Sequence, residues 1–322
     1  MRLGVFTPLF GNLGFEDMLE KVKEYGLDCI ELGTGNYPGN DHLDLDGLLE
    51  SASRRAEYLK KVSGAGLAIS ALSCHGNPVH PNTDLAKKHH DTFRKTVLLA
   101  EAMEVPVVVG FSGCPGDSAG AKNPNWVTCA WPPDYLEILD WQWNEVLIPY
   151  WIEQNKYLAD HGIKMALEMH PGFNVYNPET LLRLRSAAGP QIGANLDPSH
   201  LFWQGIEIPT AIKRLGRDNA IFYFHAKDTS IDKQNTAENG VLDVKSYARL
   251  VERSWIFRSV GWGHDMVYWR EVISALRTVG YDYVLSIEHE DALASSDEGL
   301  KKSVEFLKEV VLREQPAQMW WA

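Results

Sequence analysis

Four apolar segments in the second half of the chain end in acidic or imidazole side chains. They are residues 166–170, 195–200, 224–228 and 286–291. Desolvation at the end of a buried strand would raise the pKa of a carboxyl group unless a cation compensates for the charge. A divalent metal ion supplies that compensation. We therefore predict one metal site made of Glu168, Asp197, His225 and Glu288.

The types of these side chains indicate which ions would bind. Two glutamates, one aspartate and one histidine form a hard, mostly oxygen site, which favours Mn²⁺ and also suits Mg²⁺, Co²⁺ or Zn²⁺. Glu290 has the same strand phase as Glu288 and remains an alternative ligand, although Glu288 is nearer the apolar run. One strand-end acid is more often a helix cap or a surface charge. The prediction depends on four of them ending consecutive strands.

These residues must be positioned by a regular alternation of elements. Short β-branched or apolar runs alternate with amphipathic stretches along the chain, which is typical of repeated βα units. We predict eight strands, at residues 2–7, 29–32, 68–74, 105–111, 164–169, 191–197, 220–226 and 283–288. The GxGxxG turn of open dinucleotide-binding sheets is missing after the first strand, so we predict an α/β fold of the (β/α)₈ TIM barrel type. Residues 1–322 are expected to form one such domain.

Two helices illustrate the pattern. Phe15, Met18, Leu19 and Val22 recur at helical spacing, and Gly26 follows where a helix would stop. Residues 298–312 predict a last helix that closes the barrel.

Two connections are longer than a βα loop requires. Residues 112–133 follow the fourth strand, and residues 229–264, with a predicted helical stretch at 244–251, follow the seventh. Loops after barrel strands lie over the carboxyl-terminal mouth, where active sites are built. We expect both connections to be lids or substrate walls.

Composition narrows the function classes. A hydrophobic fraction of 45% in 322 residues indicates a globular protein, and a net charge of −12 opposes nucleic acid as a partner. We predict a cytoplasmic protein that does not bind membranes. The four cysteines lack metal-binding spacing, we find no secretory signal, and no apolar run is long enough to span a bilayer. A homo-oligomer is compatible with the sequence.

The order Glu, Asp, His, Glu at the ends of strands five to eight resembles the xylose isomerase-like TIM barrel superfamily of sugar isomerases and epimerases. The most specific segments are DPSH at 197–200, HAKD at 225–228 and SIEHED at 286–291. The resemblance spans essentially the whole chain, but the first four strands are less diagnostic. Members include ketose 3-epimerases, hydroxypyruvate isomerase, inosose dehydratases and isomerases, enzymes that process 3-keto-glycosides, and the endonuclease IV group.

This resemblance implies that Glu168, Asp197, His225 and Glu288 coordinate the metal and that Glu168 and Glu288 act as acid and base. A metal chelated by the substrate carbonyl and the neighbouring hydroxyl stabilises the enediolate, which forms when a carboxylate removes the proton between them. Return of the proton on the other face gives epimerisation, and return to the adjacent carbon gives isomerisation. The implied substrate is a keto sugar, an inosose or a 3-keto sugar.

Further side chains at strand ends are candidate substrate contacts. A single histidine is more often structural, but a position at the barrel mouth favours contact with sugar oxygens, or a role as the base. Glu31 could support the metal site, bind a hydroxyl group or cap a helix. The candidates are His75, His170, His200, Lys227 and Glu31.

Tryptophans in the long connections favour a carbohydrate or glycoside ligand, because indole faces stack on sugar rings. We expect Trp126 and Trp262 to contact substrate, whereas other tryptophans pack the lids onto the barrel. Trp320 and Trp321 are expected to cover the barrel or to meet a second subunit.

Three alternative functions remain open. A lyase or dehydratase would share the first step and then eliminate a group β to the carbonyl, such as the aglycone of a 3-keto-glycoside. A phosphodiesterase like endonuclease IV would use His75, His200, His264 and Asp265, but the fourth strand ends in Val109-Gly110-Phe111, without the histidine that such a cluster requires. A carbohydrate-binding barrel without catalysis would leave the metal quartet unexplained.

Overall fold

Eight parallel strands close into a barrel in the computed structural model, which describes residues 1–321. The ring order is β1-β10-β7-β6-β5-β4-β3-β2, and Arg2 of β1 pairs with Val284 of β10 where the ring closes. The strands are β1 (Arg2–Phe6), β2 (Cys29–Gly33), β3 (Ala68–Ser73), β4 (Val107–Gly110), β5 (Lys164–Glu168), β6 (Ile192–Leu196), β7 (Ile221–Ala226) and β10 (Val284–Ile287). The predicted (β/α)₈ barrel is confirmed, with every strand within two residues of its expected bounds.

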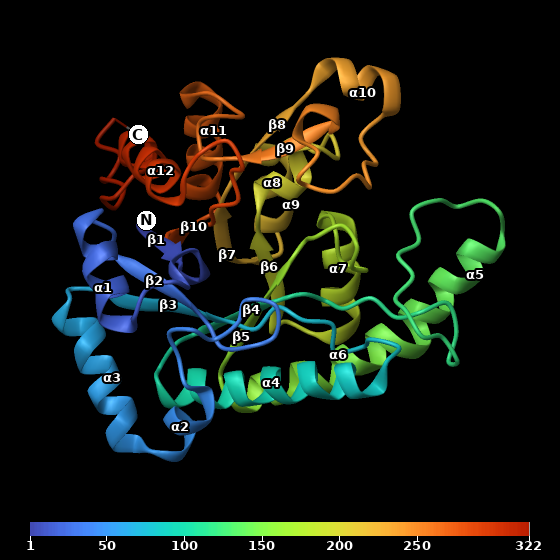
Figure 1. Cartoon of the computed structure of the whole chain (residues 1–322), viewed down its shortest axis with the longest axis horizontal. Coiled ribbons are helices and arrows are strands. Elements are labelled where there is room, and N and C mark those ends of the chain that lie inside the picture. Colours follow the sequence, from blue (N-terminus) through green and yellow to red (C-terminus); the bar gives the residue numbers. More distant parts are fainter. Residues whose placement is uncertain (322) are drawn as a thin grey trace.

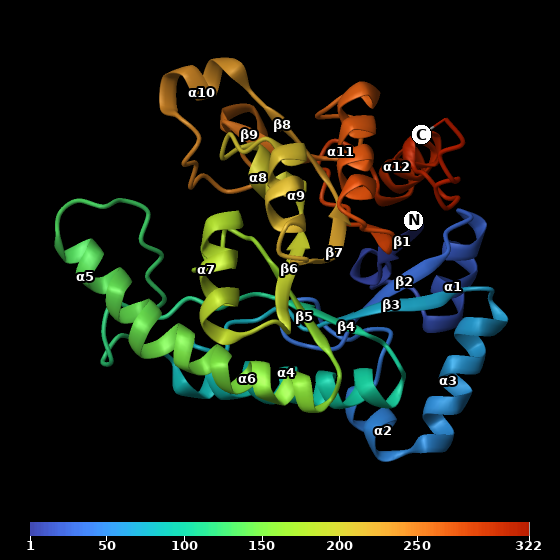
Figure 2. The same ribbon diagram turned by 180° about the vertical axis from the view of Figure 1, so that it is seen from behind.

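Helices surround the strands on the outside of the barrel, as Figures 1 and 2 show from opposite sides. They are α1 (Phe15–Glu24), α2 (Leu45–Glu50), α3 (Ala52–Gly64), α4 (Thr83–Ala102), α5 (Asp134–Trp141), α6 (Ile148–Asp160), α7 (Pro178–Ala188), α8 (Pro198–Phe202), α9 (Ile208–Gly216), α10 (Lys233–Asn239), α11 (Met266–Thr278) and α12 (Ser296–Val310). Among the described residues, none of the helices combines the length and the apolar character needed to cross a membrane.

The two helices used as examples form where expected. Met18, Leu19 and Val22 of α1 are buried, and Gly26 adopts a φ of 68°, a left-handed conformation that glycine tolerates best. The last helix ends at Val310, two residues earlier than predicted, and Val310 is buried against the barrel core.

The connection after β7 differs from the prediction. It forms an antiparallel ribbon of β8 (Asp228–Ile231) and β9 (Trp255–Arg258), with α10 between them, and the predicted helix at 244–251 is wrong. Only a short 3₁₀ turn, Leu250–Glu252, is helical there. The Asp243 carboxylate accepts hydrogen bonds from the backbone N–H groups of Lys245 and Ser254, an alternative to helical bonding that acidic side chains often provide.

The connection after β4 is irregular up to α5. Gln142 lies in the π-helical turn Gln142–Leu147 and donates hydrogen bonds to the carbonyls of Gly116 and Asn125. The loop and α5 project from the side of the barrel (Figure 1). The loop is therefore anchored to its own following helix.

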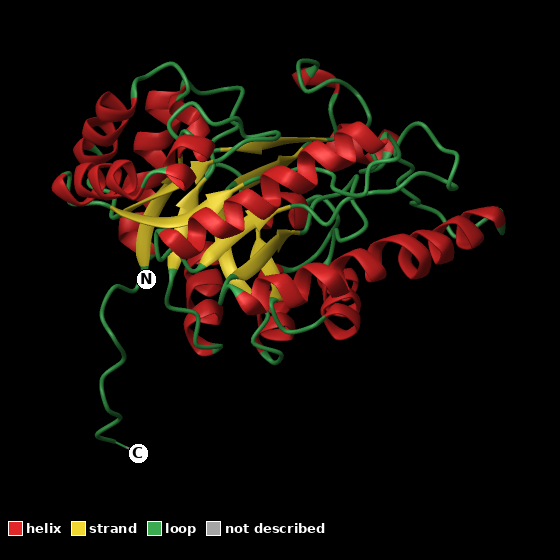
Figure 3. Cartoon of the chain, turned by 90° about the horizontal axis from the view of Figure 1, so that it is seen from below, coloured by secondary structure: helices red, strands yellow, loops and turns green. Residues whose placement is uncertain are grey.

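The chain beyond α12 runs away from the barrel (Figure 3). Trp320 is 87% exposed and Trp321 69% exposed. The expectation that they cover the barrel is therefore wrong, whereas contact with a second subunit remains a prediction.

Candidate metal centre and active site

Four ligand atoms from consecutive barrel strands lie within 4.8 Å of one another, one each from Glu168, Asp197, His225 and Glu288. Glu168 ends β5, His225 lies in β7, and Asp197 and Glu288 directly follow β6 and β10. His225 Nδ1 lies 3.3 Å from Glu168 Oε2 and 3.2 Å from Glu288 Oε2. The structure therefore brings the predicted quartet together at the carboxyl-terminal end of the strands.

Asp197 is oriented by the helix that follows it. Its Oδ1 accepts a hydrogen bond of 2.8 Å from the backbone N–H of Ser199 and thus caps α8, whose first residue is Pro198. An aspartate before proline is well suited to this position, because proline needs no N–H partner in the first turn. The cap uses one carboxylate oxygen and directs the other, Oδ2, toward the cluster.

Glu168 is held by imidazole and amide groups. His75 Nε2 lies 3.0 Å from Oε2, His200 Nε2 lies 3.1 Å from Oε1, and the Asn195 amide donates to Oε2 at 3.2 Å. Burial alone would raise the pKa of Glu168, but the neighbouring imidazoles of His200, His225 and His75 more than offset it and lower the pKa well below its usual range. Glu168 is therefore a carboxylate at neutral pH.

The donor set fits a divalent cation. Within the described residues, Asp197 Oδ2 and His225 Nδ1 are buried and form no hydrogen bond, although Asp197 Oδ2 forms an ion pair with Lys227. Burial raises the pKa of Asp197, and the neighbouring carboxylates of Glu288 and Glu168 add to this rise. A cation at this point would satisfy both open ligand atoms and relieve the charge repulsion.

Lys227 is the positive side chain beside the cluster. Its ammonium lies 3.2 Å from Asp197 Oδ2, 2.9 Å from Glu288 Oε2 and 2.8 Å from Glu290 Oε2. The side chain is only 1% exposed and lies over the ring of Phe257. Glu290, the alternative ligand in the sequence, is half exposed and pairs with Lys227, whereas Glu288 joins the metal cluster.

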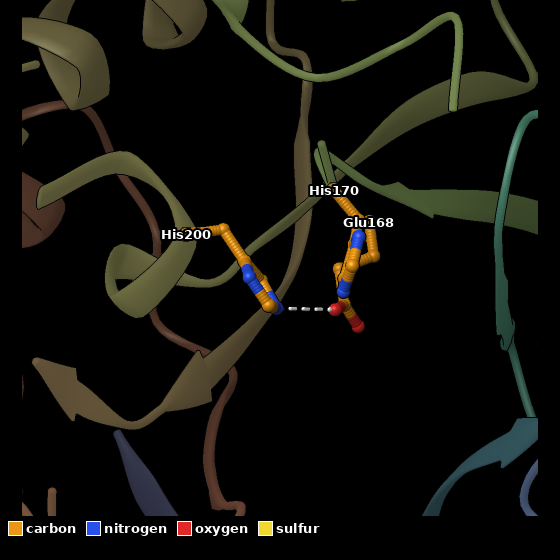
Figure 4. Close-up of side chains that lie close together, drawn as sticks. All are labelled: Glu168, His170 and His200. Atoms are coloured by element: carbon orange, nitrogen blue, oxygen red, sulfur yellow. Dashed lines mark ion pairs between the residues drawn. The ribbon is translucent and has the colours of Figure 1, made fainter. Parts of the chain in front are cut away.

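Two histidines lie on another side of Glu168. Glu168, His170 and His200 converge in Figure 4, and the two imidazole centroids are 4.0 Å apart. Burial, aided by His200, lowers the pKa of His170 to about 3, so His170 is neutral near pH 7. Its Nδ1 lies 2.5 Å from the Pro171 carbonyl, which leaves Nε2 as a hydrogen-bond acceptor.

A cavity of about 270 Å³ opens beside these groups. One side is polar, with His75, Glu168, His170, His200, Lys227, Glu288 and Glu290. The other side is mainly apolar, with Phe6, Pro8, Tyr37, Pro38 and Phe111. These apolar residues were not predicted to line the site, although Phe6 ends β1 and Phe111 directly follows β4, the same strand-end position that indicated the acids.

The remaining candidates, Glu31 and the two tryptophans, are not among the described residues that line the cavity. Glu31 is fully buried and contacts His225. Among the described residues that line the cavity, neither Trp126 nor Trp262 occurs, and their contact with a substrate remains a prediction. Trp126 packs edge-on against Tyr176, whereas Trp262 is half exposed under the side chains of Arg258 and Lys302.

The two long connections do not supply the cavity lining either. Phe111 immediately precedes the first of them, and the second reaches the site through Phe257, whose ring meets His200 edge-on. His264 pairs with Asp228 and stacks on Phe202, while Asp265 caps α11. These contacts explain both residues without an additional metal cluster.

A model of the xylose isomerase-like TIM barrel family matches residues 19–310 of the chain. Among related proteins, the uncharacterised protein YfiH of Bacillus subtilis (strain 168) is 40% identical over 314 residues, which cover 97% of this chain and 99% of the relative. The family model thus covers every strand of the barrel from β2 onward.

Several solved structures share the fold. The probable 3-DHS dehydratase AsbF of Bacillus anthracis aligns with a TM-score of 0.66 and 18% identity, covering 96% of this chain and 99% of that one. The IolI protein with a bound zinc atom gives 0.65 and 18%, with 97% and 98% coverage. A D-tagatose 3-epimerase-like protein gives 0.62 and 21%, with 96% and 98% coverage.

Proposed function

Because the chain belongs to the xylose isomerase-like TIM barrel family, we propose that it is a divalent-metal-dependent sugar isomerase or epimerase. Its substrate would be a keto sugar, an inosose or a 3-keto sugar, and the reaction would remove a proton from the carbon beside the carbonyl. The proposal is supported by the epimerase-like protein among its structural neighbours and by the zinc bound to IolI. We further propose Mn²⁺ as the favoured ion.

The observation that carries this proposal is the placement of two carboxylates around one open ligand atom. Glu168 and Glu288 lie at nearly equal distances, 3.3 Å and 3.2 Å, from His225 Nδ1. Burial raises the pKa of Glu288, but Lys227 and His225 reverse this effect and lower the pKa below its usual range. Both glutamates are thus charged and can accept a proton, which a base in this reaction must do.

Glu168, Asp197, His225 and Glu288 would hold the ion, which when bound would polarise the substrate carbonyl and acidify the neighbouring C–H. One glutamate removes this proton, and the other, which takes up a proton from solvent when the substrate binds, returns that proton to the substrate. The first glutamate then releases its proton to solvent, so both carboxylates are restored. Return to the opposite face of the same carbon gives epimerisation. Return to the adjacent carbon gives isomerisation.

The other residues of the cavity would orient the sugar. Lys227 donates to a substrate oxygen, and the neutral imidazole of His170 accepts a hydrogen bond from a hydroxyl group through Nε2. His75 and His200 hold Glu168 through their Nε2 atoms, which keeps the carboxylate in place. Phe6, Tyr37 and Phe111 cover the apolar face of the substrate and exclude water from the reacting carbon.

Solvent exchange tests this proposal. Metal-depleted protein, reloaded with Mn²⁺ in deuterated water, should incorporate deuterium beside the carbonyl of a keto sugar or keto-glycoside. Glu168→Gln and Glu288→Gln should each lower the exchange rate by about 100-fold or more, since each removes an acid–base group. Glu309→Gln, at an exposed position of α12, is the matched control. Equal exchange in all three variants would contradict the proposal.

A second candidate is a lyase or dehydratase that eliminates a group β to the carbonyl. The His170–His200 pair favours it, because epimerisation by two carboxylates does not require a second pair of acid–base groups beside Glu168. AsbF, a probable dehydratase, has the same fold. Release of water or of an aglycone, followed by chromatography and mass spectrometry, distinguishes elimination from reprotonation.

A further inference from the structure

Polar side chains occupy the barrel interior directly beneath the metal centre. TIM barrel interiors are usually filled with branched apolar side chains. Here six polar side chains from four strands have no exposed surface: Glu31, Ser70, Ser73, Tyr223, His225 and Ser286. Burial of such groups is unfavourable unless hydrogen bonds compensate for lost water. Their arrangement therefore requires an explanation beyond packing.

Glu31 is the acceptor of this cluster. Both of its carboxylate oxygens lie 3.0 Å from His225 Nε2. The Ser73 hydroxyl donates to Oε1 at 2.5 Å, and the Ser286 hydroxyl donates to Oε2 at 2.6 Å. Three donors from β3, β7 and β10 thus hold one carboxylate of β2 in a fixed position.

This geometry determines how His225 faces the metal centre. Because Nε2–H donates to Glu31, the lone pair for a metal belongs to Nδ1. That nitrogen faces Glu168 and Glu288, and within residues 1–321 it has no hydrogen-bond partner. Phe6 stacks on the imidazole with centroids 5.6 Å apart, which fixes the plane of the ring.

We propose that Glu31 is the positioning residue of the metal centre. It selects the His225 tautomer with a free Nδ1 and, through its negative charge, makes that nitrogen a stronger ligand. Carboxylates that accept the second N–H of a metal-bound histidine act in this way in other metalloproteins. The inference rests on the proposed function only in requiring that His225 binds a metal ion.

Glu31→Gln tests the role with almost no change in shape. The glutamine carries no negative charge, and its NH₂ group competes with its oxygen for His225 Nε2, which lies at equal distance from both positions. Nδ1 therefore loses the charge that strengthens it as a ligand, and the tautomer with a free Nδ1 is no longer selected. Calorimetric titration of the metal-free protein with Mn²⁺ should show affinity about 10- to 100-fold below that of the native protein.

Two serines provide matched variants. Ser286→Ala removes one donor to Glu31 and keeps the carboxylate, so Mn²⁺ affinity should fall by a smaller factor, about three- to tenfold. Ser70→Ala is the control from the same polar cluster, because the Ser70 hydroxyl bonds to the Ile30 carbonyl and the Tyr223 hydroxyl instead. Ser70→Ala should lose about as many hydrogen bonds as Ser286→Ala, but it should bind Mn²⁺ as tightly as the native protein does.

Nitrogen-15 spectra of the Zn²⁺-loaded proteins give a readout independent of activity. The native protein and Ser70→Ala should show a protonated Nε2 on His225 with Nδ1 bound to zinc. Equal metal affinity in native protein, Glu31→Gln and Ser286→Ala would overturn the inference while leaving the proposed function intact. If Glu31→Gln does not fold, the comparison of Ser286→Ala with Ser70→Ala decides. Failure of the native protein to bind any divalent ion would overturn both.

Discussion

Replacement of Lys227 by methionine should destabilise the metal-free protein, and a divalent ion should reverse most of the effect. The ammonium is 1% exposed and lies 3.2 Å from Asp197 and 2.9 Å from Glu288, which are also predicted metal ligands. Without it, these buried carboxylates repel each other, whereas methionine preserves the apolar contact with Phe257. A bound cation would replace the lost positive charge.

The expected magnitude follows from this burial. Removal of one partner of a buried ion pair costs about 3 to 5 kcal/mol. The contact with half-exposed Glu290 adds little, because solvent screens it. For a chain of 322 residues, this loss lowers the melting temperature by about 4 to 7 °C.

Calorimetric melting curves in EDTA and in excess Mn²⁺ test the prediction. The increase in melting temperature caused by Mn²⁺ should be larger for Lys227→Met than for the native protein. Lys61→Met is the control, since Lys61 forms an exposed, solvent-screened ion pair with Glu16 and the variant should melt close to the native protein. Melting of Lys227→Met within about 1 °C of the native protein in EDTA would refute the reasoning.

Three further changes have defined outcomes. Asp228→Asn should lower the free energy of unfolding in urea by about 3 kcal/mol. The buried carboxylate accepts hydrogen bonds from several N–H groups, which one amide oxygen cannot satisfy. An unchanged urea midpoint would contradict this prediction. The donors are the backbone N–H groups of Thr229, Gly261, Gly263 and His264 and the indole of Trp269. Burial raises the pKa of Asp243, but Lys245 and backbone N–H groups lower it to about 2 overall. Its stabilising contribution is therefore complete above the unfolded value of 3.8 and is lost as pH falls toward 2. Asp243→Asn should destabilise the protein more at pH 7 than at acidic pH, and an equal effect in urea titrations at both would count against this prediction. Phe111→Ala should raise the KM of the exchange reaction about tenfold with a smaller change in kcat, because it removes apolar contact from the cavity wall; an unchanged KM would exclude that contact.

The barrel could be predicted because each strand is a short buried run, and such runs are visible without knowledge of their neighbours. The polar residue at or near the end of four of these runs then predicted the metal quartet, and the structure brings the four side chains together, since parallel strands of a barrel end at one mouth. Glu31 shows where this reasoning stops. It was a candidate with several possible roles, and only ring closure, which brings β2 and β7 to face the same interior, shows that it contacts His225.

The connections could not be predicted equally well. Residues 244–251 show a helical pattern, but the Asp243 side chain binds backbone N–H groups there and favours an irregular conformation instead. Hydrophobic periodicity does not reveal such hydrogen bonds. Trp126 and Trp262 lie outside the described lining of the cavity, because residue type does not determine the direction of a side chain on an irregular loop. Phe6 and Phe111 beside the strand ends line it.

The account depends most directly on the binding of one divalent ion by the strand-end quartet. Calorimetric titration of metal-free protein with Mn²⁺ should give one strongly bound ion per chain, and the Glu168→Gln, Glu288→Gln double variant should lose it. Absence of binding in the native protein, or equal affinity in the double variant, would contradict the central claim.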